Sequence, residues 1–110
     1  SEETAKIVEY LKQRDLSVKV LSPKENVVEH LPGTVKAVFL VIGDVNEKAF
    51  ALAIKISSAC SLPLIAAAPG WTRSKVITAV KYGVDDILLT PATSDDIAEK
   101  VDAVSIRLAA

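Results

Sequence analysis

LPLIAAAPGWTRSKVITAVKYGVDDILLTPA, residues Leu62–Ala92, contains the clearest structural pattern in the chain. Its apolar runs and its helical periodicity predict a buried strand, an amphipathic helix and a second strand, at residues 62–68, 74–82 and 86–90. Pro69 and Gly70 separate the first strand from the helix, and Gly83 is placed to end the helix in a left-handed conformation. Two strands joined by a helix in this way are parallel and lie in one sheet.

The same alternation of helices and strands continues on both sides of this unit. Further strands are predicted at residues 17–21 and 35–42, and the second of these is apolar almost throughout, as expected for a strand covered on both faces. Helices are predicted at residues 1–14, 23–31, 46–57 and 94–108, with Thr4, Ser22, Asn46 and Ser94 as their N-caps. The chain is therefore expected to form one domain over residues 1–110, a doubly wound α/β fold with a parallel sheet of four visible strands.

Composition limits the classes of function. Thirteen basic and fourteen acidic residues give a formal charge of −1, which argues against a nucleic-acid partner, since such binding needs a basic surface. The longest apolar run, residues 37–42, is far too short to span a membrane, and no signal peptide is recognised. A single cysteine, Cys60, allows neither an internal disulfide nor a cysteine-based zinc site. We expect a cytoplasmic protein.

Several segments resemble the receiver domain of bacterial response regulators. LPLIAAA resembles the fourth strand of that family, KYGVDDILLTP its last strand with the preceding turn, and SDDIAEKV the start of its last helix. The resemblance implies a flavodoxin-like sheet with strand order 2-1-3-4-5 and a role in two-component signalling. The family's first strand has no counterpart. It precedes residue 1, or the second strand pairs directly with the third, or another chain fills the gap.

The residues that carry phosphotransfer in receivers are replaced in this chain. By the resemblance, Val41 stands in place of the phosphoacceptor aspartate, Ala68 in place of the serine or threonine that ends the fourth strand, and Thr90 in place of the lysine before the proline. The acidic pair that helps to hold Mg²⁺ has no counterpart, and Glu2 and Glu3 lie only near its place. The resemblance thus implies a degenerate, or pseudo-receiver, domain with no catalytic residue, metal or cofactor.

Such a domain is expected to work through contacts with other proteins in signal transduction. The resemblance implies a partner or a second copy at the face formed by the family's fourth helix, fifth strand and fifth helix. In this chain the predicted face comprises Lys75, Thr78, Ala79, Tyr82, Asp86, Leu88, Lys100 and Ala103.

Two alternative functions remain open from the sequence. Asp44, three residues after Val41, is the alternative phosphoacceptor of an active receiver; a turn next to Gly43 is the simpler role for it. A small-ligand sensor would use a pocket lined by Val41, Ala68 and Thr90. Trp71, in the loop after the predicted strand at 62–68, is expected to fill the space beside these positions.

Overall fold

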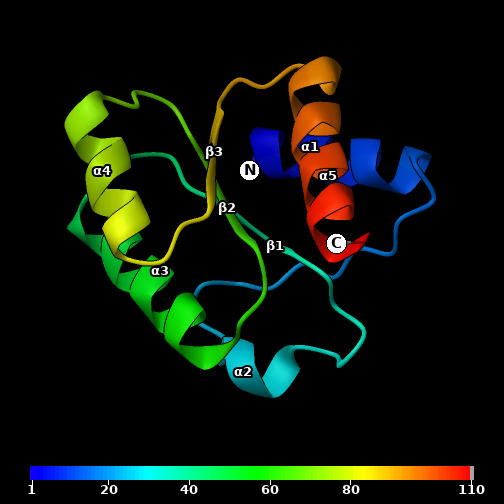
Figure 1. Cartoon of the computed structure of the whole chain (residues 1–110), viewed down its shortest axis with the longest axis horizontal. Coiled ribbons are helices and arrows are strands. Elements are labelled where there is room, and N and C mark those ends of the chain that lie inside the picture. Colours follow the sequence, from blue (N-terminus) through cyan, green and yellow to red (C-terminus); the bar gives the residue numbers. More distant parts are fainter. Residues whose placement is uncertain (110) are drawn as a thin grey trace.

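The computed structural model describes residues 1–109, which form a three-stranded parallel sheet covered by helices on both faces (Figure 1). The strands, in the order β1-β2-β3 across the sheet, are β1 (Val38–Val41), β2 (Leu64–Ala68) and β3 (Asp86–Leu89). The helices are α1 (Glu2–Gln13), α2 (Val27–His30), α3 (Glu47–Ala59), α4 (Arg73–Lys81) and α5 (Ser94–Ala109). The predicted doubly wound α/β class is confirmed.

The central strand β2 divides the core into two parts. All five of its residues are buried, because a central parallel strand has helices over both faces. Leu64 and Ala66 pack on the side of α3 and α4, whereas Ile65 and Ala67 pack on the side of α1 and α5. Figure 1 shows the same division, with the red α5 and the blue α1 together on one side of the sheet.

Each helix pair contributes an apolar stripe to its part of the core. Ile7 and Leu11 of α1 and Ile97 of α5 meet Leu88 of β3 on one face. Burial of side chains of this size contributes about 1.5–3 kcal/mol each, so these stripes hold the helices on the sheet. On the other face, the cluster of buried residues from α2, α3, α4, the strands and the turn before β3 comprises Val27, Leu40, Ala53, Ile56, Leu64, Ala66, Ala79 and Val84.

The strand predicted at residues 17–21 is wrong. One apolar residue of this segment, Val18, does pack against the buried cluster that α1 and α5 cover. However, this segment has no ladder partner, and Val20 is 61% exposed. A strand requires backbone hydrogen bonds from a neighbour, so the alternation alone does not produce one.

The helix predicted at residues 23–31 is reduced to the four residues of α2. The Ser22 N–H donates to Glu25 Oε2 at 2.9 Å and the Lys24 N–H donates to Ser22 Oγ at 3.3 Å. The bond to Glu25 is the return bond of a capping box, but Ser22 Oγ accepts from Lys24 and not from Glu25, and the two bonds close a turn before the helix begins at Val27.

The N-caps follow the expected chemistry, with shifts of one or a few residues. Asn46 caps α3 as predicted, accepting from the Ala49 N–H at 3.1 Å. In place of Ser94, Thr93 caps α5: its Oγ1 accepts from the Asp96 N–H, and its own N–H donates to Asp96 Oδ2, both at 3.1 Å. This reciprocal pair lowers the pKa of the Asp96 carboxyl, chiefly through the bond from the Thr93 backbone. Ser1, instead of Thr4, caps α1.

Gly83 occupies a position in the turn after α4 where a side chain would not fit. Its φ is +101°, and an added Cβ would collide with the Cβ of Ser57 on α3. Ser57 cannot easily move, because its Oγ donates to the Tyr82 carbonyl at 3.0 Å. We therefore expect Gly83→Ala to lower the free energy of unfolding by about 2–5 kcal/mol, the sum of backbone strain and overpacking. Urea unfolding followed by circular dichroism measures the change.

Two other glycines provide matched controls for this prediction. Gly70 also has a positive φ, +69°, but no atom within 4 Å of an added Cβ, so Gly70→Ala isolates the backbone cost of about 1–2 kcal/mol. Gly33 has neither constraint, and Gly33→Ala is expected to change stability by less than about 0.5 kcal/mol. Equal losses in the Gly83 and Gly33 variants would contradict the prediction.

Candidate functional site

The carboxyl ends of the three strands form the edge of the sheet where ligand sites of doubly wound folds occur. Ala67 of β2 pairs with Val41 of β1, and Ala68 pairs with Leu89 of β3. The Thr90 N–H donates to the Ala68 carbonyl at 3.0 Å. The structure therefore places the three predicted positions, Val41, Ala68 and Thr90, at adjacent strand ends.

The side chains at these positions offer little chemistry. Val41 is half-buried and packs against the cluster under α1 and α5. Ala68 is completely inaccessible, and Thr90 is only 6% exposed. The single polar group among them is the hydroxyl of Thr90, which lies inside the fold. None of the three side chains is a carboxylate, so none can form an acyl phosphate as an aspartate does.

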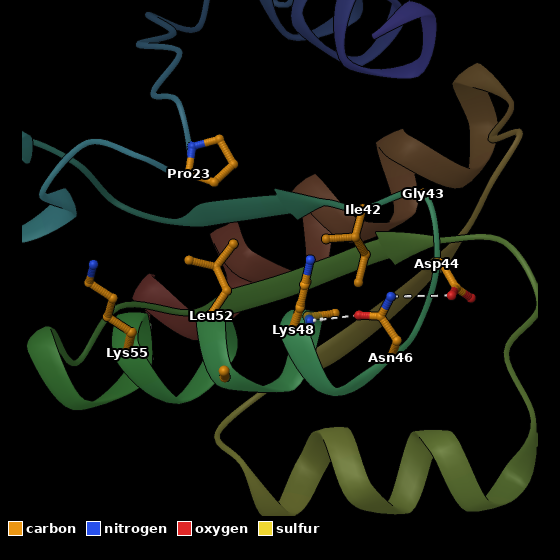
Figure 2. A pocket seen from close by; sticks show the side chains of 10 residues that line it. Pro23, Ile42, Gly43, Asp44, Asn46, Lys48, Leu52 and Lys55 are labelled. Atoms are coloured by element: carbon orange, nitrogen blue, oxygen red, sulfur yellow. Dashed lines mark hydrogen bonds between the residues drawn. The ribbon is translucent and has the colours of Figure 1, made fainter.

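Asp44 lies beyond the end of β1, in the exposed bend that leads to α3. Its Oδ2 accepts a hydrogen bond from Asn46 Nδ2 at 3.2 Å (Figure 2). Asn46 in turn caps α3 through its Oδ1. The carboxylate thus orients the capping side chain, which is the turn role expected from the sequence, and it also remains open to solvent.

Glu3 reaches the same end of the sheet from α1; the sequence placed it only near the family's acidic pair and did not predict its contact with the segment after β3. The Ala92 N–H, just after β3, donates to Glu3 Oε2 at 3.4 Å, and Lys6 Nζ lies 2.7 Å from Glu3 Oε1. The Lys6 hydrogen bond is the largest cause of a lowered pKa for this carboxyl. Its position in the first turn of α1 gave no sign of this contact, because the bond spans 89 residues of sequence.

Trp71 closes the sheet on the side of α4. Its indole Nε1–H donates to the Leu88 carbonyl at 3.3 Å, and its ring packs against the cluster that includes Leu40 and Ala79. The ring also lines a small space of about 10 Å³ among the residues of that cluster. Trp71 thus packs on the α3–α4 face, whereas Val41 packs on the α1–α5 face, so the expectation that Trp71 fills the space beside Val41, Ala68 and Thr90 stays a prediction.

Asp85 and Asp86 lie at the opposite, amino-terminal end of the sheet. Asp85 Oδ2 accepts from the Leu64 N–H at 2.8 Å, and its Oδ1 lies 3.3 Å from Arg107. Asp86 Oδ1 lies 3.1 Å from Lys100 Nζ. The two carboxylates therefore join the start of β2 and of β3 to α5, a structural role.

A solvent-open groove of about 490 Å³ lies beside the end of β1, between α3 and the segment before α2 (Figure 2). Its lining residues are Pro23, Ile42, Gly43, Asp44, Asn46, Lys48, Ala49, Ala51, Leu52 and Lys55. Neither this groove nor the space under Trp71 is lined by Val41, Ala68 or Thr90. The ligand-sensor hypothesis, which needs a pocket lined by those three positions, gains no support from either space and stays a prediction.

Within residues 1–109, no group of three or more His, Cys, Asp or Glu side chains is arranged to hold a metal ion. Over the same residues, no helix combines the length and the apolar character needed to cross a membrane.

The predicted interaction face is wrong at several residues. Ala79 and Leu88 are each 1% exposed and belong to the core, so no partner can contact them. The Tyr82 ring faces inward against Phe50 of α3, with ring centroids 5.8 Å apart. Lys75, Thr78, Asp86 and Lys100 are partly exposed, and Ala103 is exposed.

Exposed apolar side chains occupy neighbouring positions on the same elements. Val80 of α4 is 56% exposed and Leu89 of β3 is 60% exposed. Val80 directly follows Ala79, and Leu89 directly follows Leu88, the two buried residues of the predicted interaction face. A shift of one residue turns a helix position by about 100° and moves a strand position to the other face.

Comparison with known proteins gives one informative similarity. No model of a known protein family matches the chain, and no curated protein matches it. Among solved structures, the chain is similar to a two-component response regulator from Clostridium difficile, with a TM-score of 0.82 and 20% sequence identity. The alignment covers 99% of this chain and 91% of that chain. This likeness supports the flavodoxin-like, receiver-type fold predicted from the sequence and, at this identity, nothing finer.

Trp71 provides a test of how the strand ends are closed. We expect Trp71→Phe to lower the free energy of unfolding by about 1 kcal/mol through loss of the bond to Leu88. Trp71→Ala should cost about 3 kcal/mol, since it also removes ring packing from the core. Urea unfolding followed by circular dichroism measures both. The control is Ile106→Ala at a 73% exposed position, and a Trp71→Ala loss no larger than the control's would contradict the packing role.

Proposed function

We propose that this domain is a pseudo-receiver, a protein–protein interaction module of bacterial signal transduction that does not undergo phosphotransfer. The observation that carries the proposal is the set of residues at the strand ends: valine, alanine and threonine at positions 41, 68 and 90. All three side chains lie within the packed structure, and none of them is a carboxylate or an amine. The domain is not an enzyme under this proposal, and its place is the cytoplasm.

Phosphotransfer to a carboxylate needs several groups at once. A nucleophilic oxygen, hard oxygen ligands for a divalent cation and a positive side chain for the developing charge must converge on one point. Here the position of the positive side chain is Thr90, and the position of the hydroxyl is Ala68. Because these groups act together, the loss of one already removes most of their joint effect, and here several are replaced.

Asp44 is the alternative acceptor, since its carboxylate is exposed at the correct end of the sheet. Its hydrogen bond with the Asn46 side chain uses one oxygen for capping α3. Within residues 1–109, its carboxylate makes no ion pair with a lysine or arginine. Both observations favour a role for Asp44 in holding the cap of α3 over a role as phosphoacceptor.

The exposed apolar residues of α4 and β3 support the interaction role. Tyr82 packs toward α3, and Val80, about 200° away around the helix, faces away from α3. Leu89 is exposed on the outer strand β3, and Ala103 is exposed on α5. Apolar surface on adjacent elements is typical of protein–protein contacts. We propose that a second copy of the domain, or another protein, binds at this α4–β3–α5 face.

The absence of phosphotransfer is tested with Mg²⁺ and beryllofluoride, a stable mimic of a phosphoryl group on a carboxylate. We expect the amide NMR signals of residues 41–46 to remain unchanged, because no cation site and positive partner stabilise an adduct. The matched control is Asp44→Asn. An adduct in the original chain that is lost in this variant would identify an active receiver and contradict the proposal.

The interaction face is tested by measuring self-association by sedimentation equilibrium. We expect Val80→Asp and Leu89→Asp each to raise the dimer dissociation constant at least about tenfold, since a buried charge at an interface centre costs more than about 1.4 kcal/mol. Ile54→Asp on α3, at a 41% exposed position, is the control and should leave the constant unchanged. Equal effects of all three variants would contradict the assignment of the face.

A further inference from the structure

Trp71 lies just before α4 and is bonded to the strand that follows this helix. It directly precedes Thr72, whose Oγ1 caps α4 by accepting from the Lys75 N–H at 3.3 Å. Its indole Nε1–H donates to the Leu88 carbonyl at 3.3 Å. That carbonyl belongs to the peptide that links Leu88 to Leu89. Trp71 therefore joins the start of α4 to the backbone of β3 at Leu89.

α4 has little apolar packing of its own to fix its position. Of its residues, all of which the structure describes, only Ala79 is buried, whereas α1 buries both Ile7 and Leu11. Ile77 and Val80 of α4 are 59% and 56% exposed. Since apolar burial stabilises in proportion to the area removed from water, the face of α4 toward the sheet holds it only weakly. Figure 1 shows α4 joined to the sheet by one loop at each end, so these ends determine where the helix lies.

The C-terminal end of α4 is attached to α3. Ser57 Oγ donates to the Tyr82 carbonyl at 3.0 Å, and the Tyr82 ring packs against Phe50. Gly83 then lies so close to Ser57 that there is no room for a Cβ. These contacts fix the last turn of α4 and the residues after it, and they leave the first turn to another attachment.

The N-terminal attachment is the indole of Trp71. Its ring is half-buried and packs against the cluster that includes Leu40 and Ala66. The space that remains beside the ring is about 10 Å³, close to the least volume that holds one water molecule. The indole has a single N–H, and the Leu88 carbonyl accepts it. A ring that is packed and bonded in this way holds the residues before α4 against the sheet.

The two elements that Trp71 joins carry the exposed apolar residues of the proposed interaction face. Ile77 and Val80 belong to α4, and Leu89 of β3 is 60% exposed. Because side chains alternate along a strand, Leu89 shares a face with Ile87, which packs against the cluster under α3 and α4. Binding costs less conformational entropy when such groups already hold their bound arrangement. The arrangement of these apolar residues depends on how α4 is held relative to β3.

We propose that Trp71 is a positioning residue for the α4–β3–α5 face. Its ring holds the start of α4 on the sheet, and its N–H fixes the peptide that leads to Leu89. Together these contacts set the position of Ile77 and Val80 relative to Leu89, so that the face is formed before any partner binds. The purpose of the face rests on the proposed function, whereas the positioning is a property of the single domain and is measured without a partner.

Amide hydrogen exchange, followed by NMR, compares the two ends of α4. The Val76 N–H donates to the Thr72 carbonyl, and the Gly83 N–H donates to the Val80 carbonyl. We expect Trp71→Phe, which keeps a ring and removes the N–H, to speed exchange at Val76 at least about fivefold more than at Gly83.

Ser57→Ala is the matched control, since it removes the donor to a carbonyl at the other end of α4. We expect it to give the reverse pattern, with faster exchange at Gly83 and little change at Val76. A merely structural role of Trp71 would lower overall stability and speed both amides equally. Equal acceleration at Val76 and Gly83 in the Trp71→Phe variant would therefore overturn the proposal.

The ¹³C signal of the Leu88 carbonyl reports the hydrogen bond itself. We expect this signal to shift upfield in Trp71→Phe, because the carbonyl loses its donor, and to stay unchanged in Ser57→Ala. An unchanged Leu88 signal in Trp71→Phe would show that the indole does not hold this peptide, and the proposal would be rejected.

Self-association separates this inference from the proposed function. No effect of Val80→Asp and Leu89→Asp on association would contradict the proposed face, whatever the exchange pattern of α4. Where those variants weaken association as expected, Trp71→Phe should raise the dimer dissociation constant at least about threefold through lost preorganisation. An unchanged constant in Trp71→Phe, beside weakened association in the other two variants, would reject the positioning role alone.

Discussion

The burial of β2 on both faces is the constraint on which the rest of the structure depends. Five consecutive residues, Leu64–Ala68, are inaccessible, so every side chain of this strand must be covered from one side or the other. The alternation of side chains along the strand assigns α3 and α4 to one face and α1 and α5 to the other. Small alanine side chains fill three of the five positions, and they let the helices lie close to the sheet.

The same constraint explains why the end of the sheet carries so little polar chemistry. Ala68 ends the most buried strand, and Trp71 covers the sheet from the following loop while its indole bonds to Leu88. Polar function at a buried strand end requires side chains whose charges are paired or hydrogen-bonded there. In this chain, carboxylates approach the region only from its margins, Glu3 from α1 and Asp44 from the bend before α3.

Local signals in the sequence predicted the second half of the fold well. The apolar run of β2, the turn at Gly83 and the stripe of α5 each depend on residues near in sequence, and the structure has all three elements. The strand predicted at residues 17–21 is wrong because a strand needs hydrogen bonds from a neighbouring strand, and the alternating pattern of one segment does not show whether that neighbour exists. Two residues of the predicted interaction face, Ala79 and Leu88, are buried, because a helix and a strand turn their side chains away within a single position. The hydrogen bond from the Ala92 N–H to Glu3 joins residues 89 apart in the sequence, so no local pattern predicts it.

Trp71 has a consequence for how the molecule can be observed. The chain contains one tryptophan, so its fluorescence emission comes from a single known place. The indole lies half-buried at the junction of the loop before α4 and the carbonyl of Leu88 in β3. The emission wavelength depends on the polarity around the ring, so a change in the packing or solvent exposure of the loop before α4 shifts the spectrum. The ring also lines a small space with Leu40 of β1 and Ile42 just after it. An unlabelled native chromophore therefore reports on the packing of the α3–α4 face of the whole sheet.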